Sequence, residues 1–208
     1  MSKVYRHADK AIKRLRSEMS REFQNMSVTF RPNATMTLQD TRRKVSEMYD
    51  RLYDVCLIEY EEVAARARRD AQKEAHGEEK QESEIDFVKG ILSAFCLLTK
   101  YSYRNEWKRK RDRSVESLMA SQTRIDIRIS LQRALNLLDN QVRQYADIVT
   151  DEARLDAFEE AGVERVRWNT QHDGRVCEMC HERDEQVYDI RLLPTKHHRC
   201  RCYYTPVF

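Results

Sequence analysis

The chain has 208 residues, of which 35% are charged, and it contains only four glycines and three prolines. So few helix breakers favour long helices, and a hydrophobic content of 40% supports a modest core rather than one large globule. The net charge of +3 is typical of a mixed-charge, solvated surface. The longest apolar run, residues 91–98, is far shorter than the roughly 20 residues of a membrane-spanning helix. We therefore expect no membrane partner and a location in the cytosol or in a particle assembled there.

The N-terminal part of the sequence predicts two helices. Residues 3–26 carry apolar side chains at helical spacing with basic residues between them. The stretch 27–36 contains a proline followed by an asparagine and is expected to be a loop or a short strand. A second helix is predicted from a cap at Thr37 or Asp40 to about His76.

Residues 82–113 predict a third helix, whose end is basic and interleaved with aromatic side chains. A stripe of this kind suits nucleic acid, through phosphate contacts and base stacking. It equally suits acids on a neighbouring helix or a partner protein, and cations also favour the C-terminus of a helix. The candidate contact residues are Lys108, Arg109, Lys110, Arg111 and Arg113.

The next stretch has isoleucine at every second position, which is strand periodicity, but it continues without a breaker into a helical stripe. We expect a helix over 114–161, either continuous or broken once near Ser121. A strand at 124–129 is the alternative. Gly162 is expected to end this helix, and the alternation over 163–170 then predicts a short strand.

The end of the chain, from Trp168 to Cys202, contains four of the six cysteines and four of the six histidines. Two residues separate the first cysteine pair, and sixteen residues separate that pair from a second group. This is the spacing of a structural zinc site. A tetrahedral site needs four ligands, so it uses either three cysteines and the histidine or all four cysteines. The five candidates are Cys177, Cys180, His197, Cys200 and Cys202.

Local patterns indicate how these ligands are presented. Cys200 and Cys202 are two residues apart, so on an extended strand both side chains point to one face. His197 lies three residues earlier and suits a turn that leads into that strand. Asp173 and Gly174 predict a hairpin turn before the first cysteine pair. Two disulfides are the alternative to a metal, but a Cys-x-Cys pair fits them poorly.

These patterns predict a mainly α protein: a helical N-terminal region, 1–145, followed by a small α+β zinc-binding module, 146–208. The metal replaces a core that so short a module cannot build alone.

One further pattern covers roughly residues 145–206. It consists of Trp168-x-Thr170-x2-Asp173-x-Arg175-x-Cys177-x2-Cys180, then Val187-Tyr188, Leu193-Pro194, His197-x2-Cys200-Arg201-Cys202 and Pro206. This order resembles the C-terminal domain of the phage Mu gene-F-like minor head (head morphogenesis) proteins. The chain departs from the family pattern in two places. His198-Arg199 replace the usual Pro-Asn, and Glu185-Gln186 stand where an Asp-Gly turn is common.

The resemblance implies a phage minor capsid protein, present in few copies, that acts at the portal vertex in head assembly and in DNA packaging or ejection. It implies the portal protein and other capsid components as partners, with phage DNA as a further candidate. The expected location is the virion, in the head interior or at the portal vertex, after assembly in the host cytoplasm.

Because all the candidate ligands are protein side chains, we expect a closed structural zinc site, no enzymatic activity and no small-molecule substrate. The alternative is a small metal-dependent nuclease that uses His172 or His198, or another nucleic-acid-binding zinc protein.

Overall fold

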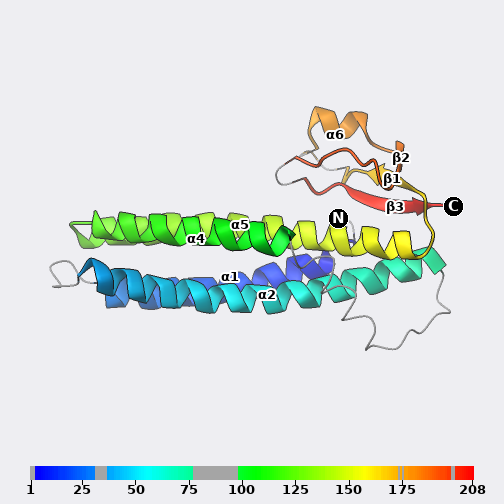
Figure 1. The fold of residues 1–208 in the computed structure, drawn as a ribbon. Coiled ribbons are helices and arrows are strands. Elements are labelled where there is room, and N and C mark those ends of the chain that lie inside the picture. Colours follow the sequence, from blue (N-terminus) through cyan, green and yellow to red (C-terminus); the bar gives the residue numbers. More distant parts are fainter. Residues whose placement is uncertain (1–2, 31–36, 77–97, 173, 175, 198–199) are drawn as a thin grey trace. The chain divides into compact units, whose positions relative to one another are not determined.

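The computed structural model describes residues 3–30, 37–76, 98–172, 174, 176–197 and 200–208, with the backbone alone for 98–102. Within these residues, four long helices are followed by a short helix and three strands (Figure 1). The predicted mainly α fold, with long N-terminal helices and a small C-terminal sheet, is confirmed. None of the described helices combines the length and apolar character needed to cross a membrane. The elements are α1 (Arg6–Thr29), α2 (Leu38–His76), α4 (Leu98–Met119), α5 (Arg124–Glu160), β1 (Arg165–Asn169), α6 (Glu178–Glu182), β2 (Val187–Asp189) and β3 (Tyr203–Val207).

The chain divides into two compact units, each assembled from distant parts of the sequence. Unit 1 comprises Met1–Lys10, Tyr60–Cys96 and Gln144–Phe208, and unit 2 comprises Ala11–Glu59 and Leu97–Arg143. Helices α1, α2 and α5 each contribute residues to both. The predicted domain boundary between residues 145 and 146 stays a prediction.

Unit 2 is a bundle of helices (Figure 1). Its core is aromatic. The Trp107 indole N–H on α4 donates to the Tyr49 carbonyl oxygen on α2 at 2.8 Å, and the two rings pack edge to face. The Tyr49 hydroxyl lies 2.6 Å from Ser114 Oγ. Ion pairs link neighbouring helices at the bundle surface. Arg51 Nη2 of α2, for example, lies 2.8 Å from Glu22 Oε2 of α1.

Reciprocal caps start two of the long helices. At α2, the Thr37 hydroxyl donates to Asp40, and the Asp40 N–H donates back to Thr37 Oγ1 at 3.1 Å. At α5, Thr123 and Asp126 make the same pair of bonds, at 2.8 and 3.1 Å. Such a box satisfies backbone N–H groups that the first helical turn leaves without partners. The predicted start of the second helix near residue 37 is confirmed.

The alternative of a strand at 124–129 is wrong, because α5 begins at Arg124. Ile127 is buried, whereas Ile125 is 69% exposed and Ile129 is 44% exposed, as one face of a helix requires. The predicted break near Ser121 is confirmed, because α4 ends at Met119, but the predicted start of a new helix at residue 114 is wrong, because α4 runs through that position.

The loop prediction for 27–36 is wrong over its first three residues, because α1 continues to Thr29. Met26 and Phe30 are both buried, and the Phe30 N–H donates to the Met26 carbonyl oxygen at 3.0 Å. The apolar stripe therefore extends one turn further than predicted. Residues 31–36, like 82–97 of the predicted third helix, lie outside the described part of the chain.

Unit 1 contains a three-stranded antiparallel sheet in the order β2-β1-β3. In the central strand, Val166 pairs with Tyr188 of β2, and Trp168 pairs with Tyr204 of β3. The strand predicted within 163–170 is thus confirmed. Strands β1 and β2 are joined through residues 170–186, which include α6, and not by a short turn near Gly174; Asp173 lies outside the described residues.

The sheet shares its core with the helices of unit 1. Gly162, with φ of +77°, ends α5 as predicted, because this left-handed conformation is favourable for glycine. Phe158 of α5 and Ala71 of α2 belong to the same buried cluster as Trp168. The buried Arg154 guanidinium on α5 pairs with Glu74 of α2 and donates to the Tyr204 carbonyl oxygen of β3 at 3.2 Å.

Candidate metal centre

The first cysteine pair is presented by α6. Cys177 is the N-cap residue, in an extended conformation with φ of −77° and ψ of 160°, and Cys180 lies within the helix. The His181 N–H donates to the Cys177 carbonyl oxygen at 2.9 Å, which closes the first turn. The Cys177 side chain is exposed, whereas Cys180 is buried. The two intervening residues therefore form one tight turn between the thiols, as predicted.

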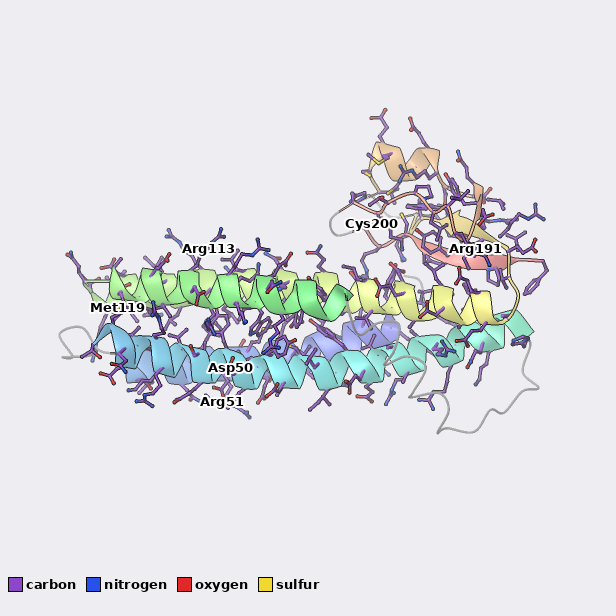
Figure 2. All side chains as sticks on the ribbon, in the orientation of Figure 1. Asp50, Arg51, Arg113, Met119, Arg191 and Cys200 are labelled. Carbon is purple, nitrogen blue, oxygen red and sulfur yellow. The ribbon has the colours of Figure 1, made fainter. Side chains whose placement is uncertain are left out.

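The second ligand group comes from the segment that leads into β3. The Cys200 N–H donates to the His197 carbonyl oxygen at 3.1 Å, so these residues form the predicted turn. Cys200 and Cys202 are both buried. They precede β3, which begins at Tyr203, so the prediction that they lie on the strand itself is wrong. Figure 2 labels Cys200 in this segment.

All five predicted ligands come together. Cys177, Cys180 and His197 form one group, and Cys180, Cys200 and Cys202 form another, each with its ligand atoms within 4.8 Å of one another. The His197 Nε2 atom lies 3.2 Å from Cys177 Sγ and 3.1 Å from Cys180 Sγ. Cys180 Sγ is 3.6 Å from Cys200 Sγ. Because Cys180 belongs to both groups, this Cys and His cluster could hold a metal ion.

The alternative of two disulfides is wrong for this structure. All the described cysteines are free thiols, including the four in the cluster. Cys56 is also free and is buried in unit 2, and Cys96 lies outside the described residues.

Hydrogen bonds lower the pKa of two of the four cluster thiols, Cys177 and Cys200. A hydrogen bond from the Cys180 backbone N–H lowers the pKa of Cys177. A hydrogen bond from the Cys202 thiol lowers the pKa of Cys200 to about 5, and the same bond raises the pKa of Cys202. Burial raises the pKa of Cys180 to about 12. The cluster therefore offers thiolate, the form of cysteine that binds metals.

Of the two histidines of the nuclease alternative, His172 does not join the cluster in the described structure. His172 is 68% exposed at its side chain and lies 3.5 Å from Asp184. Within the described residues, neither ligand group contains His172 or a carboxylate. His198 lies outside the described part of the chain.

The basic run lies inside α4 and is spread around the helix. Lys108, Arg109 and Arg113 are exposed, whereas Lys110 and Arg111 are half-buried. Figure 2 shows Arg113 on the outward side of α4. Because α4 continues to Met119, the explanation that these cations favour a helix C-terminus is wrong. Consecutive residues turn by about 100° each, so the run does not form a single face.

Three residues next to the metal cluster were not found by sequence analysis. Lys196, Asp151 and Tyr5 form a hydrogen-bonded cluster that reaches the backbone of Cys202. Tyr5 is 146 positions from Asp151 and 191 from Lys196. No local pattern connects residues so far apart in the chain.

Comparisons with protein-family models, with curated proteins and with solved structures gave no match. The resemblance to the phage Mu gene-F-like proteins therefore rests on the motif residues alone.

Proposed function

We propose that this chain is a phage minor capsid protein of the gene-F-like type whose C-terminal module is stabilised by a structural zinc ion. The observation that supports this most directly is the convergence of five cysteine and histidine side chains in two groups that share Cys180. The donor chemistry favours zinc, since thiolate and imidazole suit Zn²⁺, whereas Mg²⁺ and Ca²⁺ prefer oxygen.

The spacing of the donors also suits zinc. Zinc–sulfur bonds of about 2.3 Å at a tetrahedral angle separate two sulfurs by about 3.8 Å. The 3.6 Å between the Cys180 and Cys200 sulfurs is close to that separation. Four of the five candidates complete the site, either three cysteines with His197 or all four cysteines.

A zinc ion in this place would act as a cross-link rather than as a catalyst. Cys180, Cys200 and Cys202 are themselves members of the buried cluster that contains Trp168 and Tyr204. Four protein ligands leave no coordination position for water, which argues against hydrolysis. The ion would thus join α6 to the segment before β3 within one core, as in modules whose folding depends on metal.

An assembly role follows from the closed site and from the resemblance. We propose the portal protein and other capsid components as partners, and the virion as the location, with assembly in the host cytoplasm. Phage DNA is a further proposed partner. Mass spectrometry of purified virions, together with a pull-down using the portal protein encoded by the same phage, tests this role. Absence of the chain from virions and from portal complexes would contradict it.

The metal is tested separately by elemental analysis of the reduced, folded protein purified without added metal. We expect one zinc per chain in the wild type and in Cys56→Ser, a control outside the cluster, and a clear decrease in Cys177→Ser. Less than about 0.2 equivalents of any transition metal in the wild type would rule out the site, because structural zinc binds tightly. Magnesium-dependent DNA cleavage that is abolished in His172→Ala would instead support the nuclease alternative.

A further inference from the structure

We infer that Tyr5, Asp151 and Lys196 are positioning residues of the metal centre, which act on the ligands without binding the ion. They fix the loop that carries three of the five candidate ligands, His197, Cys200 and Cys202. The inference rests on the proposed metal site and adds to it the N-terminal segment of the chain as a structural requirement. All of these residues belong to unit 1.

Tyr5, Asp151 and Lys196 are joined to one another by hydrogen bonds. The Lys196 ammonium has three N–H donors. It donates to the Tyr5 hydroxyl oxygen at 3.2 Å and to Asp151 Oδ2 at 2.6 Å. Its third acceptor is the carbonyl oxygen of Cys202. The Tyr5 hydroxyl lies 2.8 Å from Asp151 Oδ1 and 2.7 Å from the Cys202 carbonyl oxygen, and its single proton can be donated to either acceptor.

This cluster joins the two ends of the ligand loop, Lys196 and Cys202. Lys196 directly precedes His197, and its side chain reaches the carbonyl of Cys202 at the other end of the loop. Tyr5 Oη is 2.7 Å from the same carbonyl oxygen, so Tyr5 and Lys196 converge on one backbone atom of a candidate ligand residue. The two ends of the loop are thereby held together by side chains that are not ligands.

A second contact ties the same loop to the N-terminal segment. Arg201, between the two cysteines, pairs with both carboxylate oxygens of Asp9, at 3.1 and 3.2 Å. Its guanidinium also lies 5.1 Å from the centre of the Tyr5 ring, which suits a cation–π interaction. Residues 5 and 9 therefore contact the ligand loop at Arg201 and at Cys202.

Burial raises the free-energy cost of breaking these contacts. Tyr5 is fully buried, and the side chains of Lys196 and Asp151 are only 16% and 14% exposed. A buried charge without its partner is strongly disfavoured, so the loop has little freedom to move away from α5. Hydrogen-bond partners outside the ligand set commonly change metal affinity by about 10- to 100-fold. We therefore expect the metal centre and the N-terminal segment to stabilise each other reciprocally.

The test compares metal binding by full-length Tyr5→Phe and Tyr188→Phe. The first removes the hydroxyl and keeps the ring. The second removes a hydroxyl of the same module that donates to Gln186 Oε1 at 2.7 Å, a partner outside the loop. Zn²⁺ affinity is measured by competition with a chromophoric chelator. We expect about 10- to 100-fold weaker binding in Tyr5→Phe and unchanged binding in Tyr188→Phe. Equal affinity of Tyr5→Phe and the wild type would overturn the inference.

A second readout separates positioning from a general decrease in stability. Co²⁺ bound in place of Zn²⁺ gives d–d absorption bands that depend on ligand geometry. We expect altered bands in Tyr5→Phe and in Lys196→Met, while the urea midpoint reported by Trp107 of unit 2 stays as in the wild type. Wild-type bands at saturating Co²⁺ in both variants would contradict a positioning role.

Hydrogen exchange on the wild-type protein covers the case in which a variant does not fold. Exchange of residues 3–10 is followed by mass spectrometry with and without Zn²⁺. We expect slower exchange with metal, since the loop and the segment are linked, and equal rates would overturn the inference. A wild-type chain that binds neither Zn²⁺ nor Co²⁺ would instead refute the proposed metal site, so the two failures are distinguishable.

Discussion

At the scale of single residues, Cys177 and Cys56 are thiols in opposite environments. Cys177 is exposed and its pKa is lowered, because the Cys180 backbone N–H donates to it. Burial raises the pKa of Cys56 to about 12. Since the thiolate is the reactive form, we predict that iodoacetamide at pH 8 alkylates Cys177 before Cys56 in metal-free protein and leaves Cys56 unmodified until unit 2 unfolds.

Peptide mapping by mass spectrometry after short labelling times checks this order. A metal-loaded sample is the matched control, and there we expect Cys177 to be protected. Rapid labelling of Cys56 in the folded protein would show that unit 2 opens readily. Equal labelling of Cys177 with and without metal would show that it is not a ligand.

Gly162 provides a second residue-scale prediction. Its φ of +77° is costly for any residue with a Cβ, although no atom lies within 4 Å of the Cβ position. We predict that Gly162→Ala lowers the free energy of unfolding by about 1–2 kcal/mol, entirely through backbone strain. Gly174→Ala is the control, because Gly174 has equal space and no left-handed φ. Urea unfolding followed by Trp168 fluorescence in a Trp107→Phe background measures both. Equal decreases would contradict the strain argument.

Sequence analysis could find the candidate ligands and could not find the residues that position them. Cys177 and Cys180 are joined by one helical turn, so their spacing alone indicates a shared ion. Tyr5 and Lys196 meet only because residues 3–10 and the ligand loop belong to the same unit. A tyrosine near the start of a chain and a lysine in a polar loop have no local feature that relates them.

At the scale of elements, the start of α5 shows why periodicity alone misleads. Three isoleucines at alternate positions suit a strand, but they also fit a helix on which only Ile127 faces inward. The Thr123-x-x-Asp126 box decides between the two, because it forms only at a helix N-terminus. The same box at Thr37 marks α2. Reading the boxes together with the periodicity identifies both helix starts.

The basic run of α4 gives a prediction about DNA. We predict that neutralising the exposed residues Lys108, Arg109 and Arg113 together leaves the salt dependence of duplex binding unchanged. The run is spread around the helix. The Arg109 Nη2 atom also lies 4.0 Å from Glu106 Oε1, so the charge of this residue is partly balanced within α4. The measurement is the slope of log affinity against log salt concentration for the triple Gln variant and the wild type.

Binding of DNA by this run would give a different result in the same titration. Removing one cation that neutralises a DNA phosphate makes the slope shallower by roughly 0.9. A variant that neutralises the half-buried Lys110 and Arg111 is the control, and its main effect should be on the stability of unit 2. A shallower slope for the exposed triple alone would establish α4 as a nucleic-acid surface.

At the scale of the whole molecule, neither unit is a continuous piece of chain. Unit 1 contains residues near the N-terminus together with the C-terminal sheet, and the segments of the two units alternate along the sequence. Each unit is therefore assembled from segments that are far apart in the sequence. Local patterns carry no information on this arrangement, because it depends on how distant helix segments pack.

The division into units predicts what metal removal does. Cys180, Cys200 and Cys202 lie in the core of unit 1 with Trp168, whereas unit 2 has its own aromatic core around Trp107 and Tyr49. Structural zinc contributes on the order of 10 kcal/mol to the folding of small modules. We therefore predict that a strong chelator exposes Trp168 and releases the C-terminal sheet, while Trp107 stays buried and most of the helical signal remains.

The two tryptophans make this measurable, because each unit contains one. Trp107→Phe and Trp168→Phe variants report on unit 1 and unit 2 separately by fluorescence, and circular dichroism follows the helices. Cys177→Ser should reproduce the effect of the chelator without any reagent, and Cys56→Ser should not. If Trp107 becomes exposed at the same chelator concentration as Trp168, the two units unfold as one, because α1, α2 and α5 contribute residues to both. Retention of both signals in metal-free protein would mean that the core of unit 1 is stable without the ion.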